Sequence, residues 1–434
     1  MTKTRIRFHT ALLIAASVAV SSYWVLTNSR FEPRSQPDAA LNERIAANLA
    51  AGHGFSFDER EPYRPEVTRS PFLPTLAAAV YSIVGREVRA VLWINVLMIA
   101  AAVALAYRVA RRLFRDERAA LAGAWLACLA PQVSGAAPAF LTEAPAMLQV
   151  ALGLHLLLSW PEGLGRRTAP LWAGGLGLVL ASLLLNRPNF LLPVLIAAAW
   201  SCLAALRQGS GRRRGLLIAL VFCAALGGPV LGWSARNASL GLAFSPMASG
   251  SGAGLVYEVG RYRESLLDPD EKLPASCQRY YSHSRRPLGP EELARLDADS
   301  RQWFNAFARE RWPRLLWILP ERLARLYGNE LVSVYSQPWP NAMDAVMMPA
   351  VKWLSRALFL LAALGAWFLR ARREALCVWL VLVGSLTVFH GLTVCNPRFV
   401  TPLLPVIMPY AGAAIVLAWD RLAGKPRPVN PAAG

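Results

Sequence analysis

The chain has 434 residues, of which 55% are hydrophobic and only 17% are charged, and its formal net charge is +19. A soluble domain carries roughly 25% charged residues, whereas the apolar residues here gather into runs that approach the roughly 20 residues needed to cross a bilayer. Because the basic residues lie between these runs and not on one soluble face, the charge indicates anionic membrane lipids as partners and argues against nucleic acid.

The first predicted element is an apolar run over residues 10–27, which follows three basic residues. A cleaved signal peptide has this layout, but we favour an uncleaved signal-anchor. Positive flanks stay in the cytoplasm, so in either case the next segment begins outside.

Nine further apolar runs complete a prediction of about ten transmembrane helices with both termini in the cytoplasm. Every second connection is short and rich in arginine, which supports this count because short cytoplasmic loops carry an excess of Lys and Arg. The sequence therefore predicts an all-α, polytopic membrane protein. The nine runs are residues 88–110, 119–131, 144–160, 171–185, 190–206, 216–233, 354–369, 375–394 and 399–419.

Two long segments fall on the outside in this topology and divide the chain into three parts. Residues 1–233 form an N-terminal transmembrane module that includes the first outer loop, residues 28–89. Residues 234–347 form a large extracytoplasmic loop with amphipathic stretches at 300–317 and 320–331, in which aromatic residues alternate with arginines. Such helices lie in the membrane interface. Residues 348–434 hold the last spans and a short cytoplasmic tail.

The six cysteines form no metal-binding pattern. Four of them, Cys128, Cys202, Cys223 and Cys377, lie inside apolar runs and are interpreted as small core residues. Cys277 and Cys395 fall in segments predicted outside, where a disulfide is possible, but their spacing does not support one.

Two acidic residues are predicted at the outer face beside apolar helices. Asp38 precedes a helical stretch that ends near Gly52, and Glu143 follows Thr142 at the start of a span. Each has a plain structural interpretation: Asp38 as an N-cap with Gly52 as the helix stop, and Thr142 as an N-cap with Glu143 favoured by the helix dipole. Together they place two carboxylates at one membrane face.

Four arginines are predicted at the same face, where the positive-inside bias makes them unusual: Arg69, Arg187, Arg236 and Arg398. Snorkelling toward the interface would explain any one of them. A cluster of guanidinium groups near the headgroups also suits a lipid phosphate, which it can bind bidentately.

These residues belong to short motifs that follow one another across most of the chain, and in this order they resemble the membrane glycosyltransferases of the C-type fold. The resemblance is closest to the protein-mannosyltransferase-like family, which includes the bacterial aminoarabinose transferases of lipid A. The motifs are Asp38 with residues 48–55, Arg69-Ser70-Pro71-Phe72-Leu73-Pro74, residues 107–114, Leu141-Thr142-Glu143, Asn186-Arg187-Pro188, Arg236-Asn237 with Gly241, and residues 397–405.

The resemblance implies two juxtamembrane helices in the first outer loop and an inverting transfer of a sugar from a polyprenyl-phosphate donor to the hydroxyl of a lipid, glycan or protein acceptor. By analogy Asp38 is the general base, Glu143 orients the site, and the arginines bind the lipid phosphate at the outer face of the inner membrane. Some relatives hold a divalent metal with an acidic residue beside the basic residue of the first loop. Thr68 stands at that position, so a divalent metal stays open without an assigned ligand, and no cofactor is certain.

Two other classes of function are compatible with a polytopic membrane protein. Transporters and lipid flippases usually place ionisable residues or broken helices near the bilayer midplane, whereas here these residues crowd the ends of the spans. A polymerase or ligase of lipid-linked glycans would also need outer arginines, but an early-loop Asp is less expected there.

Overall fold

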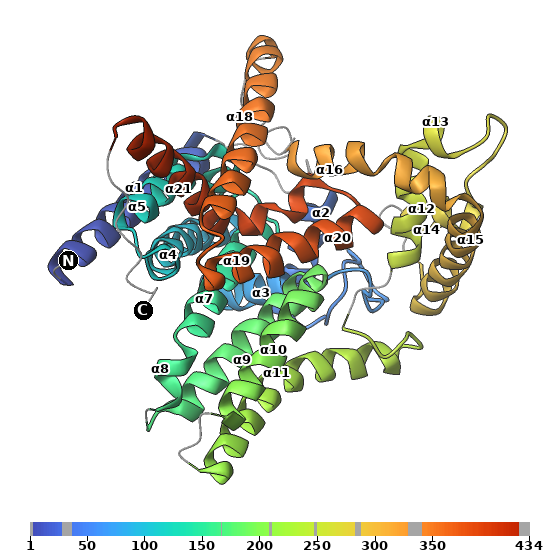
Figure 1. Ribbon diagram of the computed structural model, residues 1–434. Coiled ribbons are helices and arrows are strands. Elements are labelled where there is room, and N and C mark those ends of the chain that lie inside the picture. The colour runs from blue at the N-terminus through green and yellow to red at the C-terminus, as the bar shows by residue number, and fades with distance from the viewer. Residues whose placement is uncertain are drawn as a thin grey trace.

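The computed structural model describes residues 3–27, 37–165, 167–207, 211–246, 250–282, 288–328 and 341–424 (Figure 1). Within these ranges every regular element is a helix, as predicted. The predicted tail beyond residue 424 lies outside the described residues.

Each of the ten predicted spans falls on a helix. Seven helices of the described ranges are long and apolar enough to cross a membrane, so the chain is an all-α, polytopic membrane protein. The span-bearing helices are α1 (Lys3–Thr27), α4 (Val88–Phe114), α5 (Glu117–Leu129), α7 (Glu143–Leu158), α9 (Ala169–Asn186), α10 (Leu191–Arg207), α11 (Arg212–Ser239), α18 (Asn341–Phe368), α19 (Arg373–Trp379) continuing into α20 (Ser385–Leu392), and α21 (Leu404–Leu422).

Two of the predicted spans are shorter than a bilayer requires. Helix α5 ends at Leu129, where the prediction ran on to residue 131, because Ala130 precedes a proline and adopts an extended conformation. Helix α7 has 16 residues. Both are enclosed by longer helices, and α7 packs mainly against α4 and α9.

Ion pairs join some of the connections predicted to be cytoplasmic. Arg112, in the last turn of α4, pairs with Glu162 after α7 at 2.9 Å, and Arg118 pairs with Asp420 near the end of α21 at 2.6 Å. These contacts fit the alternation of connections read from the sequence.

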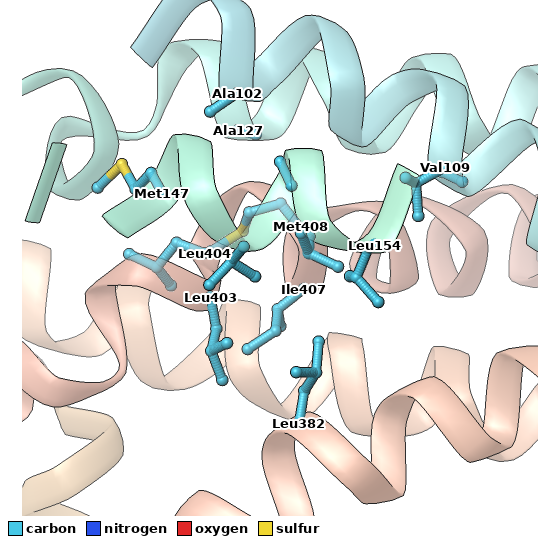
Figure 2. Close-up of a cluster of buried hydrophobic side chains, with 14 of the residues drawn as sticks. Ala102, Val109, Ala127, Met147, Leu154, Leu382, Leu403, Leu404, Ile407 and Met408 are labelled. Atoms are coloured by element: carbon cyan, nitrogen blue, oxygen red, sulfur yellow. The ribbon is translucent and has the colours of Figure 1, made fainter. Parts of the chain in front are cut away.

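The core of the bundle forms where α21 packs against α5 and α18. Figure 2 shows its apolar side chains: Met147 and Leu154 of α7 face Leu404, Ile407 and Met408 of α21. Glycines allow the backbones to approach closely. A Cβ on Gly123 of α5 would lie 2.1 Å from Pro409 Cα, and one on Gly365 of α18 would lie 1.8 Å from the Tyr410 carbonyl oxygen.

We therefore expect Gly123→Ala to destabilise the bundle, by about 1–3 kcal/mol if the helices separate to admit the methyl group. Thermal unfolding of the purified protein in detergent would measure this. Gly228→Ala is the matched control, because that glycine also lies in a span but has no atom within 4 Å of its added Cβ. Equal unfolding temperatures for the two variants would contradict the close contact.

The first outer loop contains two short helices, α2 (Pro37–Ala50) and α3 (Phe72–Val84), which pack on each other. Their shared apolar contact includes Ala39 and Ala46 of α2 and Leu73 and Ala77 of α3. After α2 the chain reverses at Gly52, which has a φ of +82°, so the predicted helix stop is confirmed.

The second outer segment is also helical, and Figure 1 shows it on the side of the molecule away from α1 and α21. The predicted amphipathic stretch 300–317 is the second half of a longer helix that kinks at Arg311. The stretch 320–331 is helical as far as Gly328, which is the last residue of that described range. The helices are α12 (Ser251–Arg261), α13 (Arg263–Leu266), α14 (Ala275–Tyr281), α15 (Pro290–Trp317) and α16 (Leu319–Gly328).

The cysteines correct one sequence interpretation. Cys277 and Cys395, whose spacing did not support a disulfide, are both free, and each thiol contacts a different backbone carbonyl, that of Ala253 and that of Arg322. Cys223 and Cys377 are exposed and not part of the core. Apolar runs do not distinguish the lipid-facing side of a span from its packed side, because both are apolar.

Candidate active site

A polar cavity of about 280 Å³ lies where the segment predicted as the first outer loop meets the ends of several spans. Its wall combines the start of α2, the irregular segment before α3 and three connections between spans. Four of the six predicted site residues line it, and a fifth, Glu143, lies directly behind them. The lining includes Asp38, Asn42, Thr68, Arg69, Ser70, Thr142, Asn186, Arg187, Asn189, Asn396 and Arg398.

Asp38 is held by two arginines that are remote from it in the sequence. Arg69 Nη1 donates to Asp38 Oδ1 at 2.7 Å, and Arg398 Nη1 donates to Asp38 Oδ2 at 2.9 Å. The N-cap interpretation is wrong, because α2 begins at Pro37 and the carboxylate of Asp38 turns to these guanidinium groups. The side chain remains 41% exposed, so it faces the cavity.

Glu143 forms the buried base of the site. It is the first residue of α7, and its residue surface is 0% exposed. Its Oε1 accepts from Arg398 Nε at 2.8 Å and forms an ion pair with Arg187 Nη2 at 2.6 Å. Thr142 makes no capping hydrogen bond, so the predicted capping is wrong. A buried carboxylate requires such partners, and in return it fixes the two guanidinium groups.

Arg398 thereby bridges the two carboxylates, and Arg187 Nη1 also donates to the Arg398 carbonyl at 3.2 Å. The cluster of three arginines and two carboxylates has one positive charge in excess. Burial raises the pKa of Asp38, but Arg69 and Arg398 lower it more, so its pKa lies well below the usual range. Asp38 is ionised in this arrangement, and the excess charge suits an anion.

Arg236 is not brought into this cluster. It lies near the end of α11, where its guanidinium packs over the ring of Trp233 at 4.7 Å and that of Phe55 at 5.5 Å, and donates to Asn237 Oδ1 at 3.2 Å. Trp233 precedes Arg236 by three residues, so the two share one face of the helix.

The sequence interpretation did not assign the asparagines that line the cavity. Asn42 lies one helical turn after Asp38 on α2, so helical spacing would have found it. Asn396 and Asn189 stand beside Arg398 and Arg187 in the turns that the motifs had singled out, and Asn396 Oδ1 accepts from the Arg398 N–H at 3.0 Å.

The donor set does not fit a divalent metal. Within the described ranges no three His, Cys, Asp or Glu residues converge, and the carboxylates of Asp38 and Glu143 are already engaged by guanidinium groups. Thr68, at the position that is acidic in some relatives, donates from its hydroxyl to Glu66.

Residues 68–233 match the sequence model of the family described as dolichyl-phosphate-mannose-protein mannosyltransferase. The chain resembles the protein mannosyltransferases. The mannosyltransferase-like stretch contains Arg69, Glu143 and Arg187, whereas Asp38 and Arg398 lie outside it. The match supports a glycosyltransferase. No curated protein sequence matches the chain.

Three solved structures are similar to the chain, each at low identity. The apo oligosaccharyltransferase of Archaeoglobus fulgidus is 16% identical with a TM-score of 0.48, over 95% of this chain and 51% of its own. The same enzyme in complex with zinc and sulfate is 14% identical with a TM-score of 0.45, over 95% of this chain and 50% of its own. ArnT from Cupriavidus metallidurans, bound to undecaprenyl phosphate, is 15% identical with a TM-score of 0.39, over 97% of this chain and 81% of its own. The chain thus spans about half the length of the oligosaccharyltransferase.

Proposed function

We propose that this protein is a glycosyltransferase that moves a sugar from a polyprenyl-phosphate donor to an acceptor hydroxyl at the outer face of the inner membrane. The observation that supports it best is the cluster of Asp38, Glu143, Arg69, Arg187 and Arg398 around one cavity at the ends of apolar helices. One positive charge in excess matches a phosphodiester, and guanidinium groups are suited to bind phosphate oxygens in pairs.

An apolar groove beside the site supports a lipid-linked donor. It has a volume of about 450 Å³ and runs between α7, α9, α10 and the helix that begins at Arg373. Gln149 lies in its wall and accepts at 3.0 Å from Asn186, the neighbour of Arg187. A polyprenyl chain in this groove would hold its phosphate near Arg187.

The proposed reaction uses the cluster in two ways. As the donor phosphate binds, it competes with Asp38 for Arg69 and Arg398, and the partly buried carboxylate that they release becomes a stronger base. Asp38 then accepts the acceptor hydroxyl proton, the new bond forms at the anomeric carbon, and the bond to the phosphate oxygen breaks with inversion. The arginines offset the charge that grows on the departing phosphate, while Glu143 keeps Arg187 and Arg398 in place.

The charge pattern supports a site on the extracytoplasmic side. Helix α7 leads from Glu143 at the site toward Glu162, which pairs with Arg112 in a connection that the positive-inside bias assigns to the cytoplasm. We propose accordingly that residues 1–233 form the catalytic module, that the segment 234–347 lies outside, and that residues 348–434 complete the site through Arg398.

Mass spectrometry of glycolipids and envelope glycans from cells with and without the gene tests this function. We expect one saccharide-bearing species to disappear when the gene is deleted, to return with the intact gene, and to identify both the sugar and the acceptor. Identical glycolipid and glycan profiles under conditions in which the protein is produced would contradict the proposal.

A further inference from the structure

The short loop that carries Arg398, residues 393–398, is held through its backbone by side chains from outside it. We call these residues the arginine loop. The carbonyl of Thr393 accepts from Arg322 Nη2, that of Val394 contacts His390 Nδ1 at 2.8 Å, and that of Cys395 accepts from Arg261 Nη1 at 3.4 Å. Three consecutive carbonyls thus each have a side-chain partner.

Two of these partners come from the second outer segment and not from the membrane spans. Arg261 ends α12, and Arg322 lies in α16. The contact with Arg322 is reciprocal, because the Cys395 thiol donates to the Arg322 carbonyl at 2.9 Å. Arg322 and Cys395 are 4% and 0% exposed, so the junction is closed to solvent.

A buried carboxylate accompanies Arg322. Glu258 of α12 is 3% exposed, and its Oε1 lies 3.9 Å from Arg322 Nε. Apolar residues often stabilise a protein as well as a buried ion pair does. Arg322 is buried, and both its guanidinium group and its backbone carbonyl bind the arginine loop. We therefore interpret Arg322 as a residue that positions this loop and not as one that mainly adds stability.

The arginine loop needs such positioning because Arg398 makes directional contacts to two carboxylates at once. Its Nε and Nη1 reach Glu143 at 2.8 Å and Asp38 at 2.9 Å. A displacement of the backbone by about 1 Å would stretch both hydrogen bonds beyond their useful range.

We propose that Arg322, together with Arg261, is a positioning residue through which the second outer segment sets the place of Arg398 in the site. The outer helices α12 and α16 thereby control donor binding without touching the donor. This inference rests on the proposed function insofar as Arg398 binds the donor phosphate, but the contact between Arg322 and the loop can be tested without any activity.

The test compares Arg322→Ala and Arg261→Ala with Arg279→Ala, each alone and combined with Arg398→Ala. Arg279 is the matched control because it lies in the same segment and pairs with Glu292, but makes no contact with the loop. The first measurement is amide hydrogen exchange in residues 393–398 of the purified full chain. The second is the affinity for a polyprenyl phosphate in nanodiscs. Arg261→Ala is included because Arg261 is only half buried, so its loss is milder if Arg322→Ala fails to fold.

We expect faster exchange in the arginine loop for the Arg322 and Arg261 variants only, and an affinity lowered about tenfold, as for loss of a charged hydrogen bond. In the Arg398→Ala background the same changes should have no further effect on affinity. Unchanged exchange in the loop, or losses of affinity that add to that of Arg398→Ala, would overturn the positioning role. If Arg398→Ala itself left the affinity unchanged, Arg398 would be a structural ion-pair partner and not a phosphate ligand, while the exchange measurement would still decide whether Arg322 holds the loop.

Discussion

Asp38→Asn is expected to lower kcat by a factor of roughly 100 to 10,000, the usual contribution of a positioned general base. The amide keeps the shape of the side chain but cannot take the acceptor proton. It also no longer pairs as an ion with Arg69 and Arg398, which hold the carboxylate at 2.7 and 2.9 Å. Because those arginines are then free for the phosphate, the donor KM should stay the same or fall. Steady-state kinetics with the purified enzyme would separate the two effects.

Asp268→Asn is the matched control for this variant. Asp268 is likewise held by two arginines, Arg311 at 2.9 Å and Arg314 at 3.1 Å, but it lies in the second outer segment away from the cavity. Its replacement should leave kcat unchanged. Near-normal turnover by Asp38→Asn, with the variant folded, would remove Asp38 from the role of base.

The lowered pKa of Asp38 adds a pH signature to the same prediction. Burial raises this pKa, but Arg69 and Arg398 lower it more in the free site, so Asp38 stays ionised as the pH falls. The pH profile of kcat/KM should therefore show no acid limb from Asp38 in the range where carboxylates usually titrate. Bound phosphate draws the arginines away, which raises the pKa in the complex. The acid limb of kcat should therefore lie at higher pH than that of kcat/KM, and Asp38→Asn should lack it.

The helices were predictable because long apolar runs and arginine-rich connections are local signals. Asp38, Glu143, Arg69, Arg187 and Arg398 were selected by residue type and motif, and the structure brings these five together. What the sequence could not supply is the pairing itself, since the contacts of Arg398 cross 360 residues to Asp38 and 255 to Glu143.

Arg236 shows the limit of the same reasoning. Topology assigns a residue to a face of the membrane but not to a position on that face. Arg236 packs over Trp233 of its own helix and over Phe55, and the Phe55 contact is tertiary, so no local pattern predicts it. The arginine loop is a second case, because its partners Arg261 and Arg322 lie in a segment in which arginine is common and no local pattern marks these two.

Arg398→Ala is expected to weaken donor binding by a factor on the order of 10 to 100, as for loss of a bidentate charged contact. The change removes a guanidinium that contacts both carboxylates, leaving Glu143 with Arg187 and Asp38 with Arg69. The site then has no positive charge in excess, which is the property that suits it to a phosphate. Titration with a polyprenyl phosphate would measure the loss. Arg398→Lys should recover only part of it, because an ammonium group restores the charge but not the paired geometry.

Arg86→Ala separates this effect from a general loss of charge at the outer face. Arg86 also holds a carboxylate with two nitrogens, Nε and Nη2 to Glu43 at 2.7 and 2.8 Å, and it lies in the first outer loop but outside the cavity. Its replacement should leave donor affinity unchanged. If both variants bound the polyprenyl phosphate as well as the unchanged protein does, Arg398 would be a structural ion-pair partner of Glu143. Snorkelling would then be the better explanation of the arginines predicted at the outer face. If only Arg398→Ala lost affinity, the bridge between the two carboxylates would be the phosphate site.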